Sequence, residues 1–172
     1  MTEYKNAIKE AMKLLAKDER TVFIGYNVAY GSKGYDSFTD IEKEKLIETP
    51  VAENLMTGIA IGMALEGYKP ILFFERHDFM LIALDALANH LDKLEILSEG
   101  EFQAPVIIRT VIGGTKPINP GPVHTQDFTE IFKKLFTFKI VELRDTKEII
   151  DQYKQALLGN EPIMFVEWKD LY

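Results

Sequence analysis

Short apolar runs alternate with helix-like segments along this chain, and this alternation constrains its fold more than any other feature. The runs predict strands over 21–24, 45–48, 71–74, 106–108, 138–141 and 163–166, and helices over 3–17, 51–66, 78–98, 127–134 and 146–158. The strands lack strict apolar–polar alternation, as expected when helices cover both faces of a sheet. We therefore predict an α/β fold with a doubly wound, mainly parallel sheet, helices on both faces, and a single domain over 1–172.

Composition excludes several classes of protein. The 172 residues carry a net charge of −7, which argues against nucleic acid as the main partner because phosphate binding favours a basic surface. No run of about 18 apolar residues is present, so no membrane span is predicted. The chain has no cysteine and no signal-peptide pattern at its start, and we expect a cytoplasmic protein without disulfides or thiolate chemistry.

The common nucleotide and hydrolase motifs are missing. The sequence contains no G-x-G-x-x-G after a strand, no Walker A motif and no G-x-S-x-G elbow. Its three histidines lack the spacing of zinc ligands. We therefore predict no metal site in this chain.

Glu53 lies in the first turn of the helix predicted over 51–66. Thr49 and Pro50 precede it as an N-cap and a proline at the first helical position. The helix follows a strand, so Glu53 is predicted at the carboxyl edge of the sheet, where ligands bind in α/β proteins. A carboxylate near a helix N-terminus also suits the helix dipole, and both interpretations stay open here.

Two helices carry unusual packing patterns. Gly58 and Gly62 each cost the helix about 0.5–1 kcal/mol. We attribute them to close backbone packing against the sheet or another subunit. The first half of the helix predicted over 78–98 is apolar nearly all round, which indicates either a central core helix or a subunit interface.

Two loops stand out. The polar segment 25–45 is a long loop with a short helix predicted near Ile41, and long loops in compact domains are often functional. A Gly/Pro-rich loop over 111–122 leads to His124, just before a helix. A histidine in such a place suits acid–base chemistry near neutral pH, although a lone loop histidine is more often polar surface.

Several segments resemble one known family in the same order along nearly the whole chain. The family is the β subunit of the 2-oxoacid dehydrogenase E1 component and, more broadly, the pyrimidine-binding domain of the transketolase superfamily. The resemblance lies in Thr49-Pro50-Val51-Ala52-Glu53, Asp78-Phe79, the His124 segment over 121–128, and residues 58–70, 84–90, 105–109, 161–167 and 171–172.

The resemblance implies roles for four residues. Glu53 matches the glutamate that hydrogen-bonds N1′ of the aminopyrimidine of thiamine diphosphate and favours the tautomer that activates the cofactor. Phe79 matches the aromatic residue that stacks on the pyrimidine ring, and His124 the histidine that handles substrate protons. Asn27 lies in a loop that approaches the cofactor, and we include it among the cofactor-binding residues.

Departures from the family limit what carries over. Tyr26 and Asn27 stand where acidic residues are usual, and Val123 and Ile82 where glutamine is common, so the substrate chemistry can differ. Family members hold the diphosphate through a metal and a Gly-Asp-Gly…Asn motif, and no Gly-Asp-Gly occurs in this chain. The family's β subunit also continues into a C-terminal domain, whereas this chain ends at Tyr172.

The resemblance and these departures together imply a split enzyme, either an oxidoreductase or a transferase. A separate subunit is expected to hold the diphosphate and magnesium, in an assembly built on a homodimer or of α2β2 form. An oxoacid or a ketose is the expected substrate. The alternative is a non-catalytic assembly or regulatory module that retains the fold.

Overall fold

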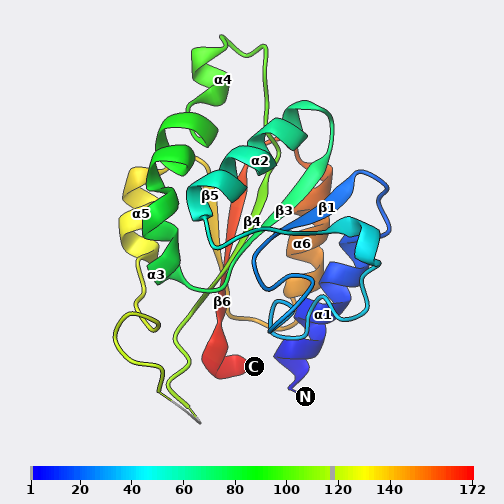
Figure 1. Cartoon of the computed structure of the whole chain (residues 1–172), viewed down its shortest axis with the longest axis vertical. Coiled ribbons are helices and arrows are strands. Elements are labelled where there is room, and N and C mark those ends of the chain that lie inside the picture. Colours follow the sequence, from blue (N-terminus) through cyan, green and yellow to red (C-terminus); the bar gives the residue numbers. More distant parts are fainter. Residues whose placement is uncertain (1, 117–118) are drawn as a thin grey trace.

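The computed structural model describes residues 2–116 and 119–172, and a six-stranded sheet runs through its centre (Figure 1). The strand order is β2-β1-β3-β4-β6-β5, and every neighbouring pair is parallel, which confirms the predicted α/β sheet. The strands are β1 Thr21–Gly25, β2 Leu46–Glu48, β3 Lys69–Phe74, β4 Ile107–Ile112, β5 Lys139–Leu143 and β6 Ile163–Trp168.

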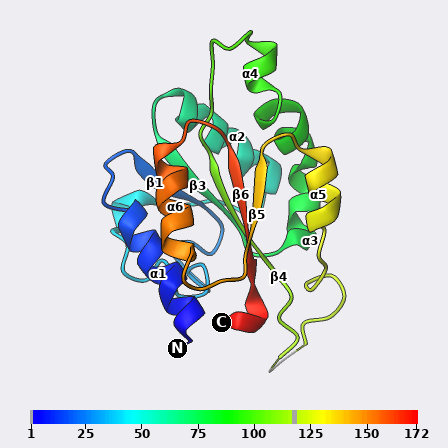
Figure 2. The ribbon, with the colours of Figure 1, turned by 180° about the vertical axis from the view of Figure 1, so that it is seen from behind.

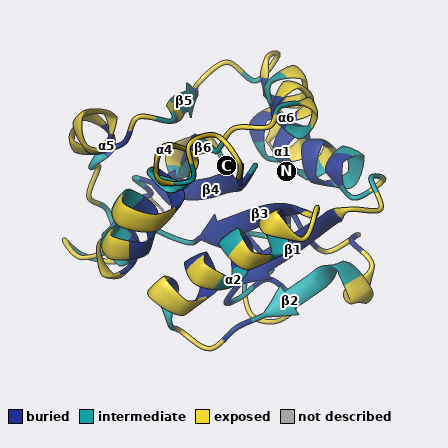
Figure 3. Cartoon of the chain, turned by 90° about the horizontal axis from the view of Figure 1, so that it is seen from above, coloured by how far each residue is buried: buried dark blue, intermediate teal, exposed yellow. Residues whose placement is uncertain are grey.

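Helices cover both faces of the sheet, as predicted (Figures 1 and 2). The helices α1 Glu3–Leu15 and α6 Ile149–Leu158 pack against each other on one face. The other face is covered by α2 Glu53–Leu65, α3 His77–Met80 and α5 Thr129–Leu135. Seen from above, the central strands β3 and β4 lie buried between these two layers, whereas the edge strands β2 and β5 are only partly buried (Figure 3).

Alternating strand side chains supply the two hydrophobic cores. In β3, Leu72 and Phe74 pack under α2, whereas Ile71 and Phe73 pack under α1 and α6. Successive side chains of a strand point to opposite faces, so a central strand buried on both faces is apolar throughout. This packing explains why the strand sequences lack a period of two.

The predicted helix over 78–98 is wrong as one regular α-helix. After α3 the chain forms a 3-10 turn over Leu81–Ala83, a π-helical turn over Ala86–Leu91 and the short helix α4 Leu94–Leu97, which projects from the body in Figure 1. The Ala86 N–H donates to the Asn54 side-chain oxygen Oδ1 (3.3 Å), which lies in α2. A side chain that takes an amide out of the helical ladder is a common cause of such irregularity.

Several boundary predictions also differ from the structure. The predicted N-cap at Thr49 is wrong, because α2 begins at Glu53 and Ala52 is its N-cap. The helix expected near Ile41 is a single 3-10 turn over Lys43–Lys45. The strand predicted over 106–108 extends to Ile112, so the Gly/Pro-rich loop starts at Gly113. No helix in the described part of the chain is long and apolar enough to cross a membrane.

The outer side of α2 carries the glycines for which we predicted close packing. A Cβ atom added at Gly58 or Gly62 would meet no atom within 4 Å, so packing of either glycine against the chain's own sheet is wrong. The neighbouring 3-10 turn exposes 45% of Leu81 and 66% of Ile82, so the interpretation of 78–98 as a fully buried core helix is wrong too. Contact with another subunit stays a prediction for both.

A candidate active site at the carboxyl edge of the sheet

The carboxyl edge of the sheet has a topological switch point between β1 and β3. From β1 the chain goes outward to β2 and then returns to β3 on the other side of β1. Loops on either side of such a point diverge and leave a crevice, the usual ligand site of open α/β sheets. Tyr26 directly follows β1, Glu53 begins α2 after β2, and Phe79 lies in α3 after β3.

Glu53 is the first residue of α2 and is only 2% exposed. No Lys, Arg or His in the described residues lies within 4.0 Å of its carboxylate. Moving a carboxylate out of water is costly unless a partner compensates for the lost hydration. A buried carboxylate without a cation is therefore better explained by a ligand than by folding.

Tyr26 faces Glu53 from the end of β1 and is 6% exposed. Burial raises the pKa of Tyr26, and the Glu53 and Glu75 carboxylates raise it further. The hydroxyl therefore stays protonated and can donate a hydrogen bond to Glu53. The sequence analysis did not select Tyr26 as a site residue, although its position directly after a predicted strand was a usable signal.

An aromatic series extends from Tyr26 through Phe79 to His124. The Tyr26 and Phe79 ring centroids are 6.4 Å apart, and the Phe79 and His124 rings meet edge to face at 5.3 Å. His124 Nδ1 is buried and has no hydrogen-bond partner among the described residues. Through Tyr26, the structure thus brings together Glu53, Phe79 and His124.

Asn27 has a different place from the other three predicted residues. Its backbone is left-handed (φ 56°), and its N–H donates to the Glu48 carboxylate (2.6 Å). Its side-chain nitrogen donates to Glu75 Oε2 (3.1 Å). Asn27 therefore shapes the loop after β1, and its predicted cofactor contact stays a prediction.

His77 is a fully buried histidine that the sequence analysis did not select as a site residue. Its Nδ1 accepts a hydrogen bond from the Phe128 N–H (3.1 Å), and its ring lies edge to face with Phe132. Burial lowers the pKa of His77 to about 4, although Asp127 and Asp78 oppose this shift. The His77 imidazole is therefore neutral at pH 7. Nothing in the sequence pattern around His77 indicated that it would be buried.

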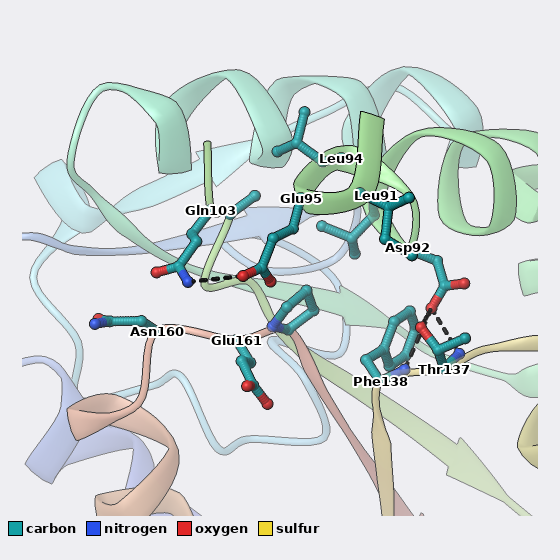
Figure 4. Close-up of a pocket in the computed structure, with 12 residues that line it drawn as sticks. Leu91, Asp92, Leu94, Glu95, Gln103, Thr137, Phe138, Asn160 and Glu161 are labelled. Atoms are coloured by element: carbon teal, nitrogen blue, oxygen red, sulfur yellow. Dashed lines mark hydrogen bonds between the residues drawn. The ribbon is translucent and has the colours of Figure 1, made fainter. Parts of the chain in front are cut away.

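A separate cavity of about 240 Å³ lies at the amino ends of β4, β5 and β6, and Figure 4 shows its lining. Two of its three carboxylates have partners: Glu95 accepts from Gln103 (3.1 Å), and Asp92 accepts from Thr137 N–H (2.7 Å). Burial raises the pKa of Asp92, but hydrogen bonds from Lys93, Thr137 and Phe138 outweigh it and leave that pKa below its ordinary value. None of Glu53, Phe79 and His124 lines this cavity.

Within 2–116 and 119–172 there is no group of three or more His, Asp or Glu side chains arranged to hold a metal ion.

Comparison with known proteins identifies the family. The model of the family "Transketolase, pyrimidine binding domain" matches residues 1–172. The chain is 31% identical to the pyruvate dehydrogenase E1 component subunit beta of Cyanidium caldarium, over 96% of this chain and 50% of that protein. It is 28% identical to the 2-oxoisovalerate dehydrogenase subunit beta of Bacillus subtilis (strain 168), over 98% of this chain and 53% of that protein.

A solved structure shares the fold. It is described as a split gene transketolase in an inactive β4 tetramer, and it superposes with a TM-score of 0.72 at 15% identity, over 97% of this chain and 50% of that chain. The chain spans about half the length of the curated relatives it matches. The predicted resemblance is confirmed: the chain belongs to the transketolase pyrimidine-binding domain family and is related to the β subunits of the 2-oxoacid dehydrogenases.

Proposed function

We propose that this chain is the pyrimidine-binding part of a thiamine-diphosphate enzyme whose diphosphate-binding part is a separate subunit. The observation that carries the proposal is the buried Glu53 carboxylate, which lacks a cationic partner and lies next to an aromatic series ending at His124. A flat, basic heterocycle suits this arrangement, because the carboxylate can hydrogen-bond its nitrogen and an aromatic face can stack on it.

Glu53 and Phe79 would hold the aminopyrimidine in this proposal. Glu53 would accept a short hydrogen bond from the ring nitrogen N1′, and low hydration strengthens such a bond. Tyr26, kept protonated by burial, would orient the Glu53 carboxylate from the other side. The bound thiamine diphosphate supplies the carbanion-stabilising chemistry itself.

His124 would exchange protons with the substrate. Its Nδ1 has no partner in the described chain, and its ring is fixed edge to face on Phe79. A histidine held this way is available to a ligand near neutral pH. The substrate class in the proposal is an oxoacid or a ketose, consistent with the names of the relatives.

The outer side of α2 and the turn beside it support assembly with other subunits. Gly58 and Gly62 leave the helix backbone open, and Leu55, Leu81 and Ile82 are exposed next to them. A second helix can approach such a backbone closely and cover the apolar side chains. We propose a homodimer or an α2β2 assembly through this face.

The diphosphate and magnesium would belong to the partner in this assembly. Within these 172 residues the sequence has no Gly-Asp-Gly motif of the kind that holds them in the family. The partner would supply that motif, so the complete cofactor site would form only between the two chains.

One observation favours the alternative of a non-catalytic assembly module. Val123, next to His124, stands where the family commonly has glutamine and is 60% exposed. An exposed apolar residue beside the histidine suits a contact surface better than a proton relay. The two functions make opposite predictions for cofactor binding.

The decisive experiment is a calorimetric titration of thiamine diphosphate with magnesium into this chain, alone and mixed with a candidate partner that carries a Gly-Asp-Gly…Asn motif. We expect binding in the mixture only, with turnover lost in the Glu53→Gln variant while the complex still assembles. Full turnover in that variant would refute the assignment of Glu53. A stable complex that binds no cofactor would instead establish the assembly module.

A further inference from the structure

Two segments of the carboxyl edge are fastened to each other near His124. The Gln126 side-chain amide donates to Asp78 Oδ1 (2.7 Å), and the Phe128 N–H donates to His77 Nδ1 (3.1 Å). We call these two hydrogen bonds the clamp. They lie next to the contact between the rings of Phe79 and His124, just before Phe79 in one segment and just after His124 in the other. The two bonds of the clamp join residues 48 and 51 positions apart along the chain, so it is a tertiary connection.

The segment that carries His124 has few fixed points of its own. It follows a Gly/Pro-rich loop, in which Gly121 is left-handed (φ 93°), and the His124 N–H returns only to the Gly121 carbonyl (3.2 Å). The helix α5 begins at Thr129, after the clamp. The clamp is therefore what ties the His124 backbone to α3, the element that carries Phe79.

Buried polar atoms without partners are concentrated in the same two segments. Among the described residues they include His77 Nε2, Asp78 Oδ2, His124 Nδ1 and Thr129 Oγ1. An unsatisfied buried polar group costs about 1–3 kcal/mol, so a native protein retains several together only for a reason. A reason consistent with the geometry is that the region is kept ready for a polar ligand, with the clamp holding its walls in place.

We infer that Asp78, acting through Gln126, is a positioning residue that holds the His124 ring against Phe79. Its Oδ1 accepts from Gln126, two residues after His124, so loss of this bond frees the histidine segment without touching the ring itself. The effect on turnover rests on the proposed function of His124. The effect on the ring position does not, and it can be measured on the full chain alone.

The test follows the imidazole signals by nuclear magnetic resonance, which is practical because the chain has only three histidines. Contact with the Phe79 face gives the His124 ring a ring-current shift. We expect Asp78→Ala and Gln126→Ala each to remove most of that shift, and the double variant to remove no more than either alone. Asp78→Asn retains the acceptor oxygen and is expected to keep the wild-type signal.

Reversing the polarity of the bond sharpens the test. Asp78→Asn combined with Gln126→Glu exchanges donor and acceptor, so the pair can still form one N–H···O bond. Gln126→Glu alone opposes two carboxylates and should displace the ring. We expect the combined variant to recover the His124 signal that Gln126→Glu alone loses, which a general loss of stability could not produce.

A matched control lies in another part of the same chain. Asn89 donates to Asp85 Oδ1 (2.8 Å) with the same chemistry, and Asp85 lies 3.6 Å from His90. Asp85→Ala should move the His90 signal and leave that of His124 unchanged. An unchanged His124 signal in folded Asp78→Ala and Gln126→Ala chains would overturn the positioning role.

Turnover of the assembled enzyme separates this inference from the proposed function. A misplaced catalytic group can cost up to about 100-fold in rate, so we expect Asp78→Ala to lower kcat by about 10- to 100-fold while cofactor affinity stays at the wild-type value. A displaced His124 ring with wild-type turnover would uphold the clamp and refute the role of His124 in catalysis.

Discussion

Glu53 and Glu167 are both almost completely buried, at 2% and 0% exposure, yet their surroundings differ. Glu167 in β6 accepts two hydrogen bonds from Arg109 (2.6 and 2.8 Å) and one from Tyr153 (2.7 Å), and the Tyr172 hydroxyl also donates to it. Glu53 has no cation in the described residues. The Glu167 carboxylate is fully satisfied inside the fold, whereas the Glu53 carboxylate lacks a cationic partner, whose place a ligand could take.

The same contrast holds for the regions around the two residues. Near Glu167, the Arg109 guanidinium lies 5.0 Å from the ring centroids of both Phe38 and Phe73, and its remaining nitrogen donates to Ser37 (2.8 Å). Near Glu53 the polar group that faces the carboxylate is the protonated hydroxyl of Tyr26. A buried charge whose hydrogen-bond partners are complete indicates a structural role in the fold, whereas a buried charge with incomplete partners indicates a ligand-binding site.

The largest expected effect comes from breaking the closed network. Arg109→Met leaves Glu167 buried without its cation, and removal of one member of a buried ion pair typically costs about 3–5 kcal/mol. We expect a loss of that size in the free energy of unfolding, measured by urea denaturation. Lys133→Met is the control, because Lys133 pairs with Glu130 and Glu142 at the surface, where solvent screens the charges, and its loss should cost much less. Equal losses in the two variants would contradict the contrast.

The second prediction concerns pH. The pKa of His77 is about 4 in the folded chain, below the ordinary value of 6.5. The unfolded chain therefore binds more protons between pH 6.5 and 4, so stability should fall as the pH decreases through this window, by about 3 kcal/mol in full.

Urea midpoints at pH 7 and pH 4.5 test this prediction. The decrease from pH 7 to pH 4.5 should be clearly smaller in His77→Gln than in the wild-type chain, because glutamine cannot be protonated there. Parallel decreases in the two chains would mean that His77 is not the group responsible.

Phe79→Ala should have a smaller effect, and it should affect only the proposed site around Glu53 and not the network around Glu167. An aromatic contact is worth about 0.5–1.5 kcal/mol beyond the buried area, so cofactor affinity in the assembled enzyme should fall by at least severalfold. Calorimetric titration measures it, and Phe102→Ala is a suitable control because Phe102 is exposed and remote from the site. Wild-type affinity in Phe79→Ala would refute the stacking role.

The sequence predicted the elements that depend on local pattern. The parallel sheet, the helix beginning near Glu53 and the position of His124 after a Gly/Pro-rich loop all follow from runs of a few residues. The regular helix over 78–98 was predicted wrongly because Asn54, from another helix, takes the Ala86 N–H. Local patterns carry no information about such an acceptor from outside the segment.

Hydrogen-bond partners far apart along the chain lie further beyond what the sequence can predict. The Arg109–Glu167 pair joins residues 58 positions apart, and the Asn27–Glu75 bond joins residues 48 apart. Tyr26 was within reach, because it occupies the edge position that also singled out Glu53. His77 was not, since only burial under Phe128 and Phe132 distinguishes it from an ordinary histidine after a strand.

The smallest expected change in stability is also the sharpest test of the comparison. Glu53→Gln removes a buried charge without leaving a cation unpaired, and the Tyr26 hydroxyl can still donate to the amide oxygen. We expect the free energy of unfolding to rise by about 0.5–1 kcal/mol, as is common when a site residue that is strained for function is relieved. Glu167→Gln is the matched substitution, and it should lower stability because Arg109 loses its counter-charge at full burial. If the free energy of unfolding rises in Glu53→Gln and falls in Glu167→Gln, only Glu53 has surroundings that await a ligand. Equal losses of this free energy in the two variants would remove the physical basis of the proposed site.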